Sequence, residues 1–374
     1  MHRSLLCVTP DAKYTEERAA FEQTLIASKK NAFTQEQIEQ ANHKLHEFQQ
    51  KDESALLNCL PHLKISELNQ KLNRIKTEKQ IIKNQNGEIP LFINQEGTNG
   101  IVYVEVAFMA DSIPVEDYPL IPLFTDIATT CGWGGKNWAE TESALAQICG
   151  GFEAGAMTSS PAKENQENKA YRNRAPVIFR IKMLAEKTEA ALKNVKDCFE
   201  GTDFSDLKRI QDIVNEVRND FDQSILDSGH SYCAMRASCK LNRSLATEEI
   251  WNGITQLFTL HSLPDAKELS KKFNTMFKLL KDGGAVLHIT SDSESLKTAL
   301  PLLKDFASYA DIKPPKPEVY CPDEKFYALT EIKPDSIADS SGIETFVTNC
   351  EVGYTSQVLK SNKWLTKESA AETV

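Results

Sequence analysis

The 374-residue chain lacks the signals that identify several classes of protein. Its nine cysteines form no Cys-x-x-Cys pair, and the closest two, Cys233 and Cys239, have no matching second pair, so a zinc ribbon is not indicated. Glu105 interrupts the apolar run at residues 101–110, and no run reaches the length of a membrane-spanning helix. The sequence contains no glycine-rich phosphate loop. The Gly283-Gly284 pair is typical of a turn before a strand and not of a nucleotide site.

An excess of basic residues is also absent. The formal net charge is −10, whereas proteins that bind phosphate backbones usually present a basic face. We therefore expect neither nucleic acid nor a membrane as a partner. Unpaired cysteines indicate a reducing compartment, either the cytoplasm or an organelle matrix. The apolar stretch at the N-terminus is too short for a secretory signal, and a targeting signal upstream of this segment stays open.

The histidines do not form a zinc-peptidase motif. His-x-x-Glu-His places two ligands one helical turn apart with a general base beside them, and no such pattern occurs among the seven histidines. Only His43 and His46 are close in sequence, and they lie in a polar helical pattern that predicts a solvated surface. The chain alone is predicted to be inactive, with no catalytic or metal-binding residue and with its substrate-binding residues unknown.

Four residues near glycine breaks are candidates for functional groups. Cys131 and Cys149 have no histidine or carboxylate placed by the sequence to activate them, so a cysteine nucleophile is rejected. Trp133 and Trp138 are predicted to pack in the core or between domains, with contact to a peptide as the alternative.

Two further histidines have both a functional and a structural interpretation. His230 follows Ser228-Gly229 at a predicted helix junction, so it is either a substrate or hinge contact or, as we favour, a helix-start residue bonded to nearby backbone. His288 lies in an apolar strand pattern and is predicted to be a core histidine with satisfied hydrogen bonds.

The order of hydrophobic patterns predicts an α+β fold. A short strand at residues 3–9 precedes two helices within residues 13–50, which we expect to pack as an antiparallel hairpin; Thr34 and Gln37 form a capping box at the second helix. Strands are then predicted at residues 90–94, 101–109, 152–158, 175–183 and 285–290. Helices are predicted at residues 119–130, 186–199, 205–227, 232–245, 247–257, 266–280 and 293–309, and after the capping box of Asn137 and Glu140.

The unit at residues 119–160 carries a family resemblance. A helix, a Cys131-Gly132-Trp133-Gly134-Gly135 break, a second helix ended by Gly150 in a left-handed turn, and a strand follow in order. This order resembles the domains of the pitrilysin/insulinase zinc metallopeptidases, most closely the presequence-protease branch. The resemblance places His-x-x-Glu-His on the first helix of the active domain. Here that turn reads Leu-Phe-Thr-Asp-Ile at residues 123–127, in which Asp126 alone could ligate zinc.

The resemblance extends along nearly the whole chain and implies its domain organisation. Residues 1–12 would be the terminal strand of a preceding domain and residues 13–76 a helical-hairpin linker. Residues 77–312 would form a non-catalytic metallopeptidase-like domain, residues 313–325 a linker, and residues 326–374 the truncated start of a following homologous domain.

The function implied by this resemblance is that of a hinge and chamber wall in a zinc endopeptidase that degrades unfolded peptides. Zinc would be bound in the complete protein and not in this chain, and the partners would be unfolded peptide and the missing N-terminal half. The alternative is a stand-alone non-catalytic homologue that acts as a binding or assembly subunit. A helical adaptor unrelated to peptidases is a third interpretation, which leaves the α+β pattern unexplained.

Overall fold

The computed structural model describes residues 6–7, 9, 11, 13–30, 32–52, 57, 59–61, 63–68, 74–159, 174–332, 337–338, 343–348, 352–359, 361–362 and 366–372. The chain divides into two units, Met1–Arg74 and Ile75–Val374. Most of the strand predicted at residues 3–9 and most of the polar loop that follows residue 159 lie outside the described residues, and Leu6, Cys7 and Thr9 are not in a strand. No described helix is long and apolar enough to cross a membrane.

The first unit contains the two predicted helices, α1 (Tyr14–Lys30) and α2 (Gln35–Gln49), and a short 3-10 helix at Ile65–Glu67. The predicted capping box begins α2. The backbone N–H of Gln37 donates to Thr34 Oγ1 at 3.3 Å, and the backbone N–H of Thr34 donates to Gln37 Oε1 at 2.9 Å. These two bonds satisfy backbone donors that the first turn of a helix leaves free.

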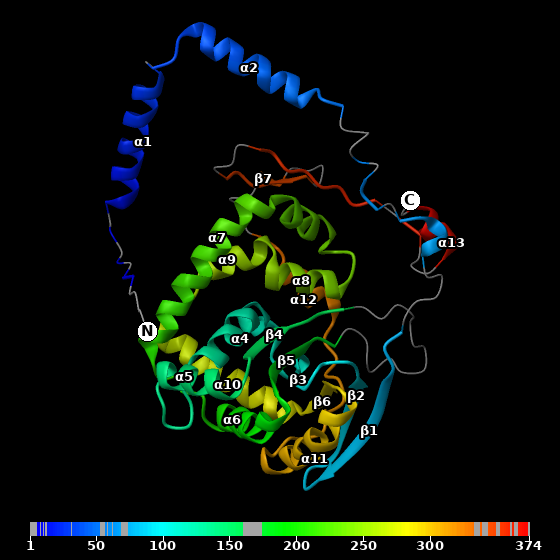
Figure 1. Ribbon diagram of the computed structural model, residues 1–374. Coiled ribbons are helices and arrows are strands. Elements are labelled where there is room, and N and C mark those ends of the chain that lie inside the picture. The colour runs from blue at the N-terminus through cyan, green and yellow to red at the C-terminus, as the bar shows by residue number, and fades with distance from the viewer. Residues whose placement is uncertain are drawn as a thin grey trace, which may run out of the picture. The chain divides into compact units, whose positions relative to one another are not determined.

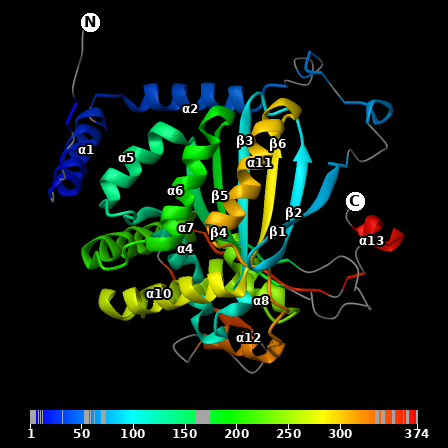
Figure 2. The same cartoon turned by 90° about the horizontal axis from the view of Figure 1, so that it is seen from below.

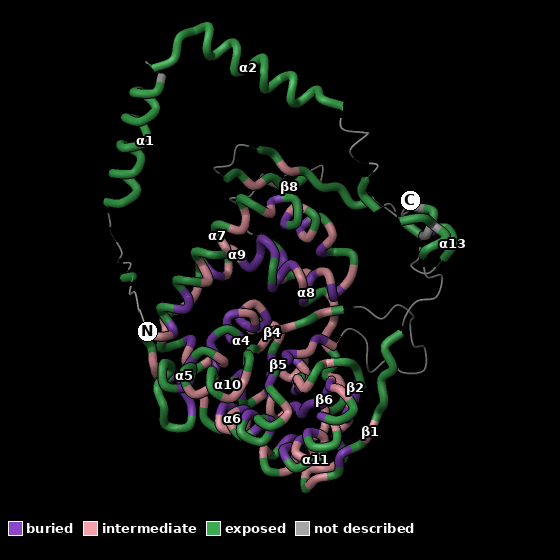
Figure 3. Tube along the Cα trace, viewed as in Figure 1, coloured by how far each residue is buried: buried purple, intermediate pink, exposed green. Residues whose placement is uncertain are grey.

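The predicted antiparallel packing of α1 against α2 is not made. The apolar residues of both helices are exposed to solvent, with Phe21 at 66% and Phe48 at 69% (Figure 3). The apolar stripe is narrow, and in α1 it is interrupted by Ser28, whose hydroxyl donates to the carbonyl of Leu25 at 2.7 Å. A stripe of this width buries little apolar area, so it contributes little free energy to packing the two helices.

The second unit contains a six-stranded mixed sheet in the order β1-β2-β6-β3-β5-β4 (Figure 1). The β2–β6 pair is parallel and the other pairs are antiparallel. The five strands predicted between residues 90 and 290 all form, and with the surrounding helices they confirm the predicted α+β fold. The strands are β1 (Thr77–Asn84), β2 (Gly87–Gln95), β3 (Ile101–Met109), β4 (Gly151–Ala156), β5 (Pro176–Leu184) and β6 (Ala285–Ser291).

The edge strand β1 was missed by the sequence reading because it is mostly polar. Only Ile82 is buried among its residues, so period-2 alternation is weak. The available signal was Asn86-Gly87, a strong hairpin dipeptide, and Gly87 has a φ of 132° in the turn between β1 and β2. Asn84 fixes this hairpin by donating to the carbonyls of Ala307 at 2.7 Å and Ile312 at 2.8 Å.

Helices cover the apolar face of the sheet. Side chains alternate along β3, so Val104 and Val106 are buried while Tyr103 on the opposite face is 41% exposed. The helices α6, α10 and α11 contact the sheet and share one hydrophobic core with it, and Figure 2 shows α6 and α11 lying over the strands. The helices with predicted counterparts are α4 (Ile121–Thr130), α5 (Trp138–Ile148), α6 (Thr188–Gly201), α7 (Leu207–Ser238), α8 (Arg243–Asn252), α9 (Ile254–His261), α10 (Ala266–Gly283) and α11 (Ser293–Tyr309).

The ends of α5 were predicted only in part. Asn137 and Glu140 form the predicted capping box, with bonds of 3.0 Å in both directions. The predicted left-handed turn at Gly150 is wrong, because α5 ends at Cys149 in an extended conformation. In this part of the chain the glycines with positive φ are Gly134 (63°) and Gly135 (78°), which lie before α5 in the turn that joins it to α4.

The predicted helix boundaries between residues 228 and 257 were wrong, whereas the helix predicted at residues 293–309 has the boundaries of α11. The helix expected at residues 232–245 is the continuation of α7, which bends at Ser228 and ends at Ser238. The next helix, α8, begins at Arg243 because the side chain of Asn242 accepts a bond from the backbone N–H of Leu245 at 3.0 Å. The helix expected at residues 247–257 is divided at Gly253, which ends α8 and precedes α9.

The C-terminal part of this unit contains α12 (Asp323–Leu329), the strand pair β7 (Ile337–Ala338) and β8 (Glu344–Thr345), and α13 (Lys367–Glu372). Within the described part of residues 343–359, only Glu344 and Thr345 are in a strand. Phe326 is 1% exposed and contacts Tyr118 and the guanidinium of Arg243. The predicted domain boundaries remain predictions.

We predict that Asp292→Asn destabilises the second unit. Asp292 caps α11 by accepting from the backbone N–H of Ser295 at 2.9 Å, and it accepts from the backbone N–H of Gly100 at 2.7 Å. These bonds lower the pKa of Asp292 to about 2. Stability from this carboxylate is therefore complete above its unfolded pKa of about 4 and is lost as the pH falls from about 4 to about 2.

Thermal unfolding at a series of pH values tests this prediction. The variant should melt a few degrees lower at pH 7, and its melting temperature should fall less steeply than that of the wild type below pH 4. Asp265→Asn is the matched control, because Asp265 caps α10 through Glu268 alone. Parallel pH curves for the wild type and Asp292→Asn would contradict the assignment.

Candidate functional site

Helix α4 occupies the position that the sequence resemblance gave to a zinc motif. Leu123, Phe124 and Ile127 are at most 1% exposed, so this turn is packed into the core. Asp126 is on the outward side, where lost hydration and the nearby Glu216 carboxylate raise its pKa to about 6. No group of three or more His, Cys, Asp or Glu within the described residues could hold a metal ion. The turn of α4 at residues 123–127 therefore does not fit a zinc ion.

His43 and His46 lie on α2 and are exposed, as the polar pattern predicted. His43 Nδ1 is 3.5 Å from a carboxylate oxygen of Glu47, and His46 Nε2 is 2.9 Å from the amide nitrogen of Gln50. These contacts join residues one helical turn apart on the surface of a single helix.

The cysteines and tryptophans beside the glycine break have packing roles. Burial raises the pKa of Cys131 to about 12 and raises that of Cys149, so both thiols are protonated at neutral pH and are poor nucleophiles. Trp133 is 3% exposed and contacts Phe152 edge-on. Trp138 is on the surface of α5, with the guanidinium of Arg209 over its ring at 4.2 Å.

His288 is satisfied as predicted, but it does not lie in the core. It is on the face of β6 opposite the helices, where its Nδ1 is 3.0 Å from Glu105 Oε2 and its Nε2 is 2.6 Å from Asn94 Oδ1. Arg180 donates to the other oxygen of Glu105 at 2.9 Å. The bond with His288, with Arg180 in support, lowers the pKa of Glu105 despite partial burial. Polar groups therefore pair across four neighbouring strands, β2, β6, β3 and β5, on this face.

The prediction that His230 lies at a helix start agrees with the structure, because α7 consists of two helical stretches that meet at a kink at Ser228. His230 follows the bend at Ser228, where φ is −123° and ψ is 25°. His230 is exposed and its ring centroid lies 6.3 Å from that of Tyr354. The neighbouring Gly229 is buried, and a Cβ atom at that position would overlap the Tyr354 ring. The Ser-Gly-His sequence thus marks a contact with the C-terminal segment.

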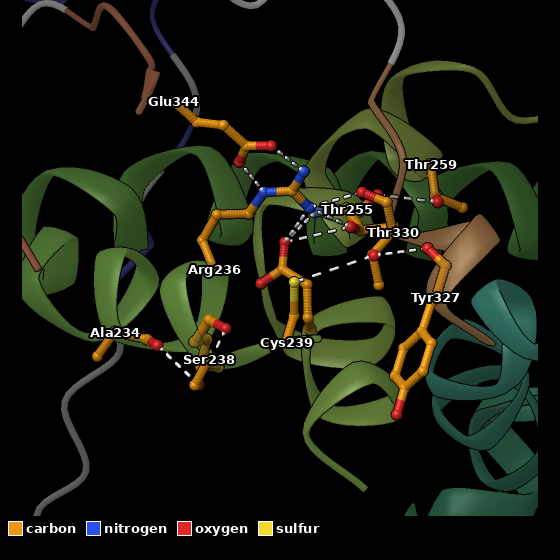
Figure 4. A network of polar contacts seen from close by, with 11 residues as sticks. Ala234, Arg236, Ser238, Cys239, Thr255, Thr259, Tyr327, Thr330 and Glu344 are labelled. Atoms are coloured by element: carbon orange, nitrogen blue, oxygen red, sulfur yellow. Dashed lines mark hydrogen bonds and ion pairs between the residues drawn. The ribbon is translucent and has the colours of Figure 1, made fainter. Parts of the chain in front are cut away.

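The most extensive buried polar cluster around this contact is centred on Arg236 (Figure 4). Its side chain is 7% exposed, and it binds Glu344 through two bonds, Nε to Oε2 at 2.5 Å and one terminal nitrogen to Oε1 at 3.0 Å. The other terminal nitrogen donates to the carbonyl of Thr330 at 2.7 Å and to Glu249 Oε1 at 3.3 Å. Two parallel bonds make the Arg236–Glu344 pair strong and directional.

Glu249 is the fully buried member of this cluster. Its Oε1 accepts from the backbone N–H and the hydroxyl of Thr255, both at 3.1 Å, whereas its Oε2 has no hydrogen-bond partner within the described residues. Burial raises the pKa of Glu249, although bonds from Thr255 and Arg236 act in the opposite direction. Gly253 leaves room for this carboxylate, because a Cβ atom there would overlap Oε2.

The partners of Arg236 are not evident from the sequence. Glu249 is 13 residues away and Glu344 is 108 residues away, so no local spacing connects them. The cluster joins α7, the α8–α9 pair and the C-terminal segment. The polar groups of the cluster bind one another, so the geometry supports a structural role in which the cluster holds these three parts of the chain together.

Comparisons with known proteins agree with the resemblance drawn from the sequence. Residues 8–263 match the family model for the associated region of M16 peptidases, subfamily C. The chain is 26% identical over 254 residues to Protein HypA of Clostridium perfringens, covering 67% of this chain and 25% of that protein. It is 24% identical over 327 residues to Presequence protease 1, chloroplastic/mitochondrial, of Arabidopsis thaliana, covering 84% of this chain and 29% of that protein.

A solved structure, the peptidase M16 inactive domain from Pseudomonas fluorescens, matches with a TM-score of 0.41 and 15% identity, covering 65% of this chain and 53% of that one. The chain spans about a quarter of the length of the curated relatives it matches, at 25% and 29% of the two proteins above.

We predict that Arg236→Leu destabilises the second unit by about 3–5 kcal/mol, because it leaves Glu249 as a buried carboxylate without its cation. Arg180→Leu is the control; that arginine and its partner Glu105 are each 32% exposed, so the loss should be below about 1 kcal/mol. Denaturant unfolding measures both. Adding Glu249→Gln to Arg236→Leu should recover part of the loss, and equal losses for the two arginine variants would contradict the buried-charge explanation.

Proposed function

Because the chain belongs to the family of regions associated with subfamily C of the M16 peptidases, we propose that it serves as a hinge and chamber wall in a zinc-dependent endopeptidase that degrades unfolded peptides. The chain itself is a non-catalytic region of that family. The observation that carries the proposal is α4, which presents core residues and a lone Asp126 at the position where the sequence resemblance places His-x-x-Glu-His. Zinc and the general base would therefore come from another domain of the complete protein.

Exposed surfaces support a role within a larger assembly. The helices of the first unit expose apolar side chains along their length, among them Phe21, Leu25, Leu45 and Phe48. Apolar surface of this extent is typical of a site that contacts other protein. We propose the missing N-terminal half as that partner, with these helices as the hinge between halves.

The polar face of the sheet supports the proposed role as a chamber wall. Glu105, Arg180 and His288 pair with one another on this face, and Tyr103 is open beside them. Paired charges and an aromatic ring offer hydrogen bonds and apolar contact to a passing unfolded peptide without a deep pocket of fixed shape. The buried thiols of Cys131, Cys198 and Cys239 are free, which favours a reducing cytoplasm or organelle matrix.

The alternative is a stand-alone non-catalytic homologue that acts as a binding or assembly subunit. The same observations on α4 favour it equally, since loss of zinc ligands leaves the fold intact. The two proposals differ in the size of the native protein and in whether a zinc-binding half belongs to the same polypeptide.

An immunoblot of source cells tests this choice first. We expect a band far above the 41.9 kDa of this chain, because the matched segment covers only 25% of a curated relative. A band at 41.9 kDa would contradict the hinge-and-wall proposal and favour the stand-alone subunit.

A biochemical assay tests the predicted inactivity of the segment. The purified chain supplied with zinc should not hydrolyse an unfolded fluorogenic peptide, whereas the native full-length protein should hydrolyse it and lose activity with a chelator. The Asp126→Asn variant is the control for a cryptic site, and its behaviour should equal that of the unaltered chain. Hydrolysis by the segment that disappears in this variant would overturn the assignment of α4 as non-catalytic.

A further inference from the structure

One side of α7 binds the C-terminal segment, by which we mean residues 343–348 and 352–359, at four positions. Leu226, Gly229, Cys233 and Arg236 are separated by three or four residues, so they line one stripe of the helix. We call these four residues the α7 seat. The bend at Ser228 lies within it.

The seat holds the segment at two places. At one place Tyr354 packs on Gly229, its hydroxyl donates to the carbonyl of Leu226 at 3.3 Å, and its own carbonyl accepts from the thiol of Cys233 at 3.6 Å. At the other place Arg236 binds the carboxylate of Glu344. Gly229 thus leaves space for an aromatic ring, and Arg236 pairs with an acidic side chain.

The remainder of the segment contributes little burial. Val347 is 89% exposed, Val352 is 58% exposed and Leu359 is 72% exposed, while Glu344 keeps 34% of its side chain in solvent. Phe346 adds a ring contact with Phe258 at 6.5 Å between centroids. A segment held by an ion pair and a few ring contacts, with most of its residues exposed, opens at a lower free energy than the core. The hydrophobic core, by contrast, includes Phe326 before the segment and residues of α10 and α11.

Release of the segment would not leave Arg236 without a partner. Glu249 lies 3.3 Å from the guanidinium through Oε1, and its Oε2 has no partner within the described residues. When Glu344 leaves, Glu249 remains as a buried counter-charge for Arg236. The cost of removing Glu344 from a buried arginine is therefore reduced.

From this geometry we propose that the α7 seat is a reversible docking site for a segment carrying a glutamate and a downstream tyrosine, and that Glu344 and Tyr354 of the same chain occupy it. The proposal is independent of the peptidase role, since it concerns only contacts within the second unit. Docking would fix the course of the chain after α12.

A peptide-binding experiment tests the docking site in the full-length chain. The probe is a fluorescein-labelled synthetic peptide of residues 343–359 with Cys350 replaced by serine. The receptor is the full chain carrying Glu344→Ala and Tyr354→Ala, which frees the seat. By fluorescence anisotropy the wild type should bind the peptide at least ten-fold more weakly than this receptor, because its own segment competes. A peptide with both alanine replacements should bind neither.

A glycine pair supplies matched controls. Adding Gly229→Ala to the receptor should abolish binding, because its Cβ would overlap the tyrosine ring. Adding Gly201→Ala should leave binding unchanged, since nothing lies within 4 Å of a Cβ there. Equal binding by the wild type and the receptor, or unaltered binding after Gly229→Ala, would overturn the proposal.

Hydrogen exchange on Tyr354→Ala gives a second test that does not depend on the receptor. Exchange of residues 352–359 should accelerate at least ten-fold, while β3 should be unchanged because Tyr354 lies outside the core. Unchanged exchange of that segment would contradict docking at the seat. Sedimentation should show a monomer; a wild-type dimer that Tyr354→Ala dissociates would assign the segment to a second copy and overturn docking within one chain.

Discussion

The structure of the second unit depends on one-sided burial of its mixed sheet. Alternate residues of β3 and β6 enter a continuous apolar core, and the residues between them face the other way with polar partners. Helices must cover the apolar face, because exposing it would return a large apolar area to water. This requirement makes α4 a core helix, since Phe124 contacts Phe204, Phe273 and Phe277 from other parts of the chain. A helix so packed has no inner surface left for metal ligands.

The elements that sequence predicted well are those with strong local signals. The strand β3 alternates cleanly, α5 has a complete capping box, and α11 begins at an aspartate cap, so periodicity and capping place them within a residue or two. The elements that were missed depend on the rest of the molecule. The polar edge strand β1 forms because β2 is beside it, and the space above Gly229 is occupied by the ring of Tyr354, which is distant in the sequence.

The candidate site was harder to predict than the fold. The absence of a zinc motif could be read directly from residue types, and so could the surface position of His43 and His46. The partners of Arg236 could not, because an ion pair between residues 108 positions apart leaves no periodicity in the sequence. His288 was placed in the wrong environment for a related reason. Its apolar neighbours occupy the helix-covered face, whereas strand geometry directs His288 itself to the polar face.

The position of β6 has a consequence for how this unit is made. It lies between β2 and β3, so two strands that are consecutive in the chain are not neighbours in the sheet. The residue pair Leu91 and Leu287 illustrates the sequence distance that this parallel pairing spans. A ribosome must therefore release almost the whole unit before its central strand can enter the sheet. Until then β2 and β3 each have an open edge, and a nascent chain of this protein would require protection from other strands at that stage.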